Sequence, residues 1–329
     1  MDAKRRAFLK AGAVGALAVT NGANAAGNGA RPEAPSMARG MTLLSMRNGE
    51  GYTLGVKTPK GVLDVKKAAR ALKSNAPTTM DALIAGGDGG LAELVQQAKS
   101  GALYLDEAKI AFGPCVTNPE KIICVGLNYA RHAREVGQPI PKLPILFNKY
   151  NNALTGHRGV VKVSQEPAEK FDYEIELVIV LGKTARNVSE ADALSYVFGY
   201  CTGNDLSARD LQSRTSQWML GKTFDGSGPV GPYLVSADQV PDPNALTLEL
   251  KVNGEVRQSS NTADMVFDCK ALIAYISRHM TLRPGDIIFT GTPEGVISGY
   301  PKDKQVWLKP GDKIAASIEK LGTQEITLA

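Results

Sequence analysis

The chain has 329 residues, of which 43% are apolar and 22% are charged, and its formal net charge is +5. This is the composition of a globular protein, and it excludes disordered and collagen-like classes. Basic side chains near the N-terminus, offset by Asp2, put +3 of the charge into the first 25 residues; they are Lys4, Arg5, Arg6 and Lys10. The remaining net charge of +2, on residues 26–329, gives no reason to expect a nucleic-acid partner.

Residues 1–25 predict a twin-arginine signal peptide. The pair Arg5-Arg6 is followed by a weakly apolar stretch, 11–19, and by the small residues Ala23-Asn24-Ala25 of a cleavage site. This stretch is shorter than the roughly 20 apolar residues that span a bilayer, so we expect no membrane insertion after signal removal. The predicted location is the periplasm. The alternative is a basic tail on a cytoplasmic protein in which the signal is not used.

Residues 26–40 predict a flexible linker, because they contain Gly, Ala, Asn, Pro and Ser without a hydrophobic period.

Residues 41–115 predict a small N-terminal α/β domain with no cluster of reactive side chains. Its short apolar runs lie at 42–46, 52–56 and 61–65, and its helical patterns lie at 65–72, 80–84 and 91–98.

Residues 116–329 predict a second, larger domain, which is rich in strands and has few long helices. The expected strands are 122–126, 145–147, 173–181, 196–202, 246–252, 287–290 and 313–318, and one clear helix is expected at 267–280. Asn253-Gly254 predicts a hairpin turn, because both residues tolerate a positive φ. Without regular β-α-β alternation, the fold class indicated is α+β.

The segment D-Y-E-I-E-L at 172–177 predicts a pair of buried carboxylates. In a strand over 173–181, Glu174 and Glu176 share one face, with Cβ atoms roughly 6.6 Å apart. An isolated E-x-E is commonly an exposed strand face. Here the continuation Val178 to Leu181 is apolar on both faces, which is typical of a covered strand. Two buried carboxylates repel each other and need compensation, and a cation supplies it.

Asp205 offers a third carboxylate and follows the apolar run 196–201. Three oxygen ligands without histidine or cysteine suit Mg²⁺ or Mn²⁺ and leave positions open for water and substrate. The competing interpretation is that Asp205 or Asp210 caps a helix that starts near Ser207. For Asp210 we favour capping over ligation.

His132 lies three residues before Glu135, a spacing that places imidazole and carboxylate side by side on a helical turn. The carboxylate can then orient the ring and raise its basicity. An isolated pair of this kind commonly lies on the protein surface and has no catalytic role. Neither Gly-Lys-Thr tripeptide, at 182–184 or 221–223, has the glycine spacing of a phosphate-binding loop.

Together these segments resemble the fumarylacetoacetate hydrolase family over about Lys121 to Leu328. The matching motifs lie at 121–135, 147–149, 172–177, 199–212, 220–232, 252–267 and 282–296. The run 252–296 looks most like the domain-containing-2 branch and its bacterial relatives. The resemblance implies a mixed β-barrel or β-roll catalytic domain in a homodimer. It departs at Arg131, where relatives often have an acid, and at Gly226-Ser227.

The resemblance also implies a role for each matching residue. Glu174, Glu176 and Asp205 match the ligands of Mg²⁺ or Mn²⁺, in agreement with the carboxylate pattern. His132 and Glu135 match a catalytic dyad on a mobile lid, and Lys222 matches a cation beside the metal. Arg209, Gln212 and Thr292 match substrate contacts.

These residues lead to a hypothesis in which a 2-oxo acid chelates the metal and water, deprotonated by His132, attacks a carbonyl two carbons further along. The enzyme would then hydrolyse a carbon-carbon bond in a 2,4-dioxo acid, as acylpyruvases and fumarylacetoacetases do. The alternative at the same site is a keto-enol tautomerase, isomerase or decarboxylase of a 2-oxo dicarboxylic acid such as oxaloacetate. A third hypothesis is an exported 2-oxo-acid-binding protein without turnover.

Overall fold

The computed structural model describes residues 37–329. The predicted signal peptide and all but the last four residues of the predicted linker lie outside the described residues. Among residues 37–329, no helix combines the length and the apolar character needed to cross a bilayer.

The first described elements match the short runs expected from the sequence. Strands β1 (Thr42–Asn48), β2 (Gly51–Thr58), β3 (Gly61–Asp64) and β4 (Tyr104–Leu105) pair antiparallel in sequence order, and the helices between them are α1 (Val65–Leu72), α2 (Met80–Gly86) and α3 (Leu91–Gln97). β1 also pairs with a later strand, β14 (Leu234–Ser236). These strands therefore belong to the same sheet as the region after 115, and the domain boundaries given above stay a prediction.

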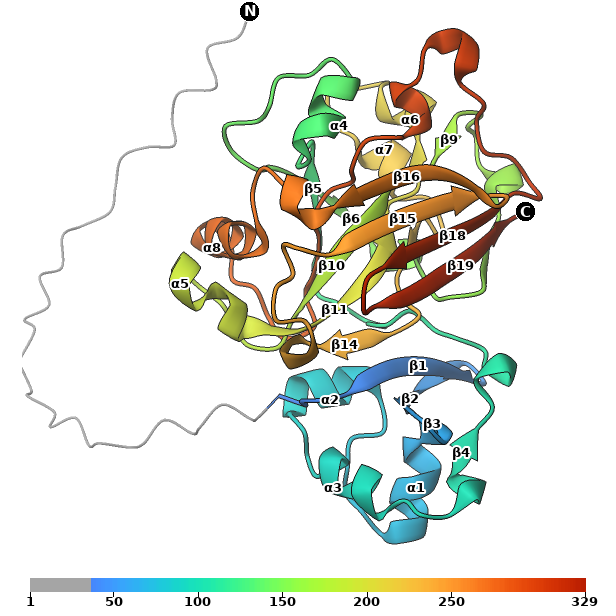
Figure 1. Cartoon of the computed structure of the whole chain (residues 1–329), viewed down its shortest axis with the longest axis vertical. Coiled ribbons are helices and arrows are strands. Elements are labelled where there is room, and N and C mark those ends of the chain that lie inside the picture. The colour runs from blue at the N-terminus through green and yellow to red at the C-terminus, as the bar shows by residue number, and fades with distance from the viewer. Residues whose placement is uncertain (1–36) are drawn as a thin grey trace, which may run out of the picture. The chain divides into compact units, whose positions relative to one another are not determined.

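A ten-stranded mixed sheet dominates the structure, in the order β4-β3-β2-β1-β14-β11-β10-β17-β5-β6 (Figure 1). Its remaining strands are β5 (Ile122–Gly126), β6 (Ile145–Lys149), β10 (Ile175–Leu181), β11 (Val197–Asn204) and β17 (Ile287–Phe289). Within this sheet β17 and β5 pair in parallel, whereas β10 pairs antiparallel with both β11 and β17. β10 is thus an interior strand, and all seven of its residues are buried.

A second sheet of five strands has the order β16-β15-β18-β19-β8. Its strands are β8 (Gly159–Val161), β15 (Thr247–Val252), β16 (Glu255–Asn261), β18 (Lys313–Ile318) and β19 (Gly322–Leu328). Two small pairs complete the described strands: β9 (Phe171–Asp172) with β12 (Ser207–Ala208), and β7 (Leu154–Thr155) with β13 (Gly228–Pro229). The α+β class is confirmed, and within residues 37–329 neither large sheet closes into a barrel.

The expected helix and hairpin of the second half are both present. Helix α8 (Cys269–His279) begins at the N-cap Asp268, whose side chain accepts a hydrogen bond from the Ala271 N–H, and it packs beside α5 (Glu190–Ala193) (Figure 1). Asn253 and Gly254 have φ of 52° and 87° and join β15 to β16, as the turn chemistry predicts.

Three short helices, two of which contact β12, carry most of the predicted site residues. They are α4 (Ala130–Glu135), α6 (Arg209–Gln212) and α7 (Met219–Lys222). Isolated helices of this length are unstable in water, so the side chains on them are held in place by tertiary contacts.

Candidate active site

The pairing of β10 with β11 brings the predicted metal ligands together. Ile175 is registered opposite Asn204, so the next residues beyond the ladder, Glu174 and Asp205, face each other. Their backbones are joined by a hydrogen bond of 2.9 Å from the Asp205 N–H to the Glu174 carbonyl. Glu174 therefore lies just before β10. The prediction that it lies within the strand was wrong by one residue, because the ladder ends at Ile175.

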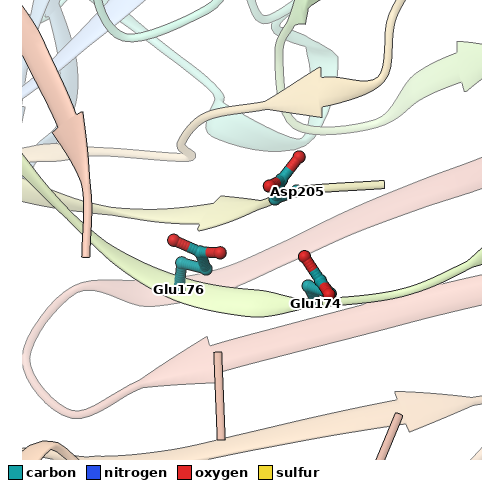
Figure 2. A group of neighbouring side chains, drawn as sticks. All are labelled: Glu174, Glu176 and Asp205. Atoms are coloured by element: carbon teal, nitrogen blue, oxygen red, sulfur yellow. The ribbon is translucent and has the colours of Figure 1, made fainter. Parts of the chain in front are cut away.

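Glu174, Glu176 and Asp205 form a compact buried cluster (Figure 2). One oxygen from each side chain lies within 4.8 Å of the others. Glu176 also accepts a 2.7 Å hydrogen bond from the Gly291 N–H. Gly291 has a φ of 100°, and a Cβ atom there would lie 2.8 Å from that of Asn128, so only glycine fits this approach.

Basic side chains surround the cluster. Lys222 Nζ lies 2.6 Å from Glu174 Oε2 and 2.9 Å from Asp205 Oδ2. Arg209 donates from Nη2 to Glu174 Oε1 at 2.7 Å and from Nε to Asp172 Oδ2 at 2.8 Å. Lys149, also buried, lies 2.7 Å from Asp205 Oδ1. Three cations thus face four carboxylates, and the local charge is not balanced by protein groups alone.

The protonation of the cluster follows from these contacts. Burial and the charges of Asp205 and Glu174 raise the pKa of Glu176 well above its ordinary value. Burial alone would also raise the pKa of Glu174, but Arg209 and Lys222 hold it well below its usual range. For Lys222, burial is outweighed by Asp205 and Glu174, so its pKa is raised. Without a metal, Glu176 is thus the carboxylate that favours a proton.

The cluster fits a hard divalent cation. Asp205 Oδ1 is buried and has no hydrogen-bond partner among residues 37–329, although Lys149 Nζ lies 2.7 Å from it as an ion pair. A dication between the carboxylates would satisfy this oxygen, replace the proton favoured by Glu176 and offset the excess of negative charge. The donor set holds only oxygen atoms, which suits Mg²⁺ or Mn²⁺.

The dyad residues also meet. His132 Nδ1 lies 3.3 Å from Glu135 Oε2 on α4, and His132 is buried, with 6% of its surface exposed. Glu135 Oε1 accepts a hydrogen bond from the Gly295 N–H at 2.9 Å. The carboxylate can therefore fix the orientation of the imidazole ring. Because His132 is buried, the pair is not an exposed surface contact.

A cavity of about 580 Å³ opens onto the cluster, within the size range of small-molecule sites. Seven of the nine predicted site residues line it: His132, Glu174, Glu176, Arg209, Gln212, Lys222 and Thr292. The other two, Glu135 and Asp205, are not among the residues that line the cavity. Both tryptophans of the chain, Trp218 and Trp307, also line the cavity, and they form aromatic walls that the sequence interpretation did not predict.

Two buried residues that hold the site received no role from the sequence. Asp172 accepts hydrogen bonds from Arg209 and from the backbone N–H groups of Ile297 and Ser298, which orients the guanidinium. Lys149 contacts Asp205, Ser227 and the Lys222 carbonyl. Lys149 is the last residue of β6, and its place in the F-N-K motif was the signal that the sequence offered.

The capping interpretation of Asp210 was wrong. Helix α6 has Ala208 at its N-cap and no side-chain cap, whereas Asp210 Oδ2 accepts the Glu169 N–H at 2.9 Å. Asp210 therefore ties the segment before β9 to α6, because that segment approaches the first turn of the helix.

Comparisons with known proteins agree with this architecture. The family model described as "Fumarylacetoacetate (FAA) hydrolase C-terminal" matches residues 121–329. The "Fumarylacetoacetate hydrolase domain-containing protein 2 homolog" of Dictyostelium discoideum is 49% identical over 62% of this chain and 70% of its own length. "Oxaloacetate tautomerase FAHD2A, mitochondrial" of Bos taurus is 40% identical over 83% of this chain and 86% of its own.

Among solved structures, maleylpyruvate hydrolase from Sphingobium sp. SYK-6, in complex with manganese (II) ion and pyruvate, is similar with a TM-score of 0.71. It is 31% identical and covers 88% of this chain and 99% of its own. The similarity extends to the part of the chain before residue 121.

We predict that Glu176→Gln lowers the affinity for Mn²⁺ by on the order of 10²-fold or more, because a neutral amide replaces the carboxylate that completes the cluster. The metal-free variant should stay folded, since a neutral amide resembles the protonated carboxyl group that Glu176 favours without a metal. Isothermal calorimetry with Mn²⁺ measures the first effect and thermal unfolding the second. The exposed Glu190→Gln serves as the control, and a Glu176→Gln protein with wild-type affinity would refute ligation.

We predict that Lys149→Met destabilises the metal-free protein by about 3–5 kcal/mol, the usual cost of leaving one partner of a buried ion pair alone. Lys162→Met, an exposed lysine, should change little. Denaturant unfolding measures both. If Lys149→Met unfolds like wild type, Asp205 does not depend on this lysine.

Proposed function

The chain belongs to the fumarylacetoacetate hydrolase family, and we propose that it is a divalent-metal-dependent enzyme that interconverts the enol and keto forms of a 2-oxo dicarboxylic acid such as oxaloacetate. The observation that carries this proposal is the buried cluster of Glu174, Glu176 and Asp205 at the wall of a cavity that His132 and Lys222 also line. An acidic cluster, a basic ring nitrogen and a buried ammonium are the groups that move a proton next to a 2-oxo group.

Glu174, Glu176 and Asp205 would hold Mg²⁺ or Mn²⁺, whose charge makes the C–H beside a 2-oxo group more acidic. Lys222 adds a fixed positive charge where negative charge develops on the substrate oxygen. His132 accepts the proton of the enol hydroxyl or donates one to the adjacent carbon, and Glu135 keeps the ring in the orientation that this transfer needs. The reaction relocates one proton and consumes no water.

The remaining cavity groups would bind the ends of the substrate. Gln212 and Arg209 are joined by a 3.0 Å hydrogen bond and present donors to a carboxylate. The Thr292 hydroxyl is already engaged, since it donates to the Ile175 carbonyl and accepts from Gln258. Thr292 therefore shapes the cavity wall more than it binds an anion.

The similarity to the tautomerase of Bos taurus favours tautomerisation over hydrolysis. That relative is 40% identical over 276 residues, whereas maleylpyruvate hydrolase is 31% identical. This preference reverses the order of the two hypotheses drawn from the sequence.

Hydrolysis of a carbon-carbon bond is the second candidate, and the His132–Glu135 pair favours it. In that reaction His132 deprotonates a water that adds to the carbonyl two carbons beyond the 2-oxo group. The bond between that carbonyl carbon and the carbon next to the 2-oxo group breaks, and the latter carbon takes up the proton that His132 removed from water. The products are a carboxylic acid and pyruvate, or a longer 2-oxo acid. The similarity to maleylpyruvate hydrolase supports the same candidate.

We expect the Mg²⁺- or Mn²⁺-loaded protein to accelerate conversion of enol-oxaloacetate to the keto form, followed by ultraviolet absorbance, and to leave acylpyruvates intact by mass spectrometry. His132→Gln should lower kcat by about 10²-fold or more, because it removes the proton-transfer group. Gln138→Ala, a change on the cavity rim, is the control and should retain most of kcat.

Release of pyruvate from acylpyruvates with no effect on enol-oxaloacetate would instead support hydrolysis. Calorimetric binding of oxalate with neither reaction would support the non-catalytic binding protein. Either result would overturn the tautomerase proposal.

We also propose that the protein is exported by the twin-arginine route and acts as a homodimer. Replacing Arg5 and Arg6 by lysine should abolish export of the full chain in a bacterial host with this pathway, because the paired guanidinium groups are read by the export machinery. Immunoblots of periplasmic and cytoplasmic fractions measure the change. Equal periplasmic amounts of wild type and variant would refute the export proposal.

A further inference from the structure

Helix α4 carries the His132–Glu135 pair but has little stability of its own. It has six residues, and its N-cap, Tyr129, makes no side-chain hydrogen bond to the first turn. A helix this short does not persist in water without outside contacts. The position of the dyad therefore depends on the groups that hold α4 against its neighbours.

Asp264 supplies the missing cap from a distant segment. Its Oδ2 accepts a 3.1 Å hydrogen bond from the backbone N–H of Arg131, in the first turn of α4, and its Oδ1 lies 3.5 Å from Arg131 Nε. A carboxylate at this end of a helix satisfies an otherwise unpaired N–H and interacts favourably with the helix dipole. Backbone and side chain of Arg131 thus engage the same residue.

The guanidinium of Arg131 also reaches the loop that holds the dyad carboxylate. Its Nη1 lies 3.0 Å from Glu294 Oε1. The next residue, Gly295, donates its N–H to Glu135. Further along the loop, a Cβ atom at Gly299 would lie 2.4 Å from Glu135 Cδ, so this loop closes tightly on the dyad carboxylate.

We propose that Arg131 is a positioning residue that clamps α4 onto the loop 292–299 and so sets the orientation of the His132–Glu135 pair. Catalysis by that pair rests on the proposed function; the clamp itself rests on the contacts. The second oxygen of Glu294 is buried and has no hydrogen-bond partner, and Arg131 is the only cation paired with this carboxylate among residues 37–329. Loss of Arg131 leaves Glu294 uncompensated and frees the loop to shift.

The clamp is a weak one, because the Arg131 side chain is 49% exposed. Ion pairs this exposed are screened by salt and reopen readily. A reversible contact suits a helix whose His132 lines the cavity that substrate must enter. It also gives the clamp a dependence on ionic strength that a packing contact lacks.

Arg131→Ala should lower kcat of the metal-loaded enzyme by about 10-fold, less than the 10²-fold that a displacement of about 1 Å can cost, and should leave KM nearly unchanged. Arg131→Lys should recover part of the loss. The matched control is Arg134→Ala, on the same helix, exposed and in no ion pair within the described residues. Glu294→Gln should add little once Arg131 is alanine, since the two residues act as one unit.

Amide hydrogen exchange of the full-length protein tests the clamp without any substrate. The peptide covering 129–136 should exchange faster in Arg131→Ala than in wild type or Arg134→Ala, while α8 is unchanged. Raising the salt concentration should speed exchange in wild type and not in Arg131→Ala. Unchanged exchange would overturn the clamp, and faster exchange with wild-type kcat would overturn its role in positioning the dyad. If wild type turns over no substrate, the proposed function fails while the exchange result still decides the clamp.

Discussion

The site depends on the burial of several carboxylates in one small volume. Glu174, Glu176 and Asp205 lie at the open end of the β10–β11 ladder, where water is largely excluded. Repulsion in this environment can be relieved by protonation, by basic side chains or by a metal ion. The protein uses basic side chains for two of these carboxylates and leaves Glu176 with a single backbone donor, Gly291. Because no basic side chain pairs with Glu176 among residues 37–329, its charge is left for a dication to compensate.

The neighbouring cations do more than balance charge. Lys222 joins Glu174 to Asp205, and Arg209 joins Glu174 to Asp172, so one continuous network runs from the strand ends to the loop at Ile297. Side chains locked in such a network hold their geometry when a ligand arrives. The site is thus rigid at the carboxylates, whereas α4 is attached through half-exposed contacts. The carboxylate cluster and the His132–Glu135 pair therefore lie in parts of the fold with different stability.

The elements themselves were largely predictable from the sequence because they depend on local patterns. Alternating or continuous apolar runs predicted the strands, and the Asn253-Gly254 turn was predicted from the positive φ that it requires. The boundary error at Glu174 and the wrong capping role of Asp210 share one cause. The strand boundary depends on where β11 stops pairing with β10, and the role of Asp210 depends on the approach of the segment at Glu169. Neither can be read from the local sequence alone.

Sequence patterns were enough to predict two carboxylates at the start of a buried strand, Asp205 as a third oxygen ligand for Mg²⁺ or Mn²⁺, and His132 beside Glu135; the family motifs added Lys222. The contacts of Lys149 with Asp205, and of Arg131 with Asp264 and Glu294, could be found only in the folded chain, and Asp264 lies 133 residues from Arg131. The physical reason is that periodicity and turn propensity act within a few residues, whereas ion pairs form between whichever side chains strand register and loop packing bring into contact.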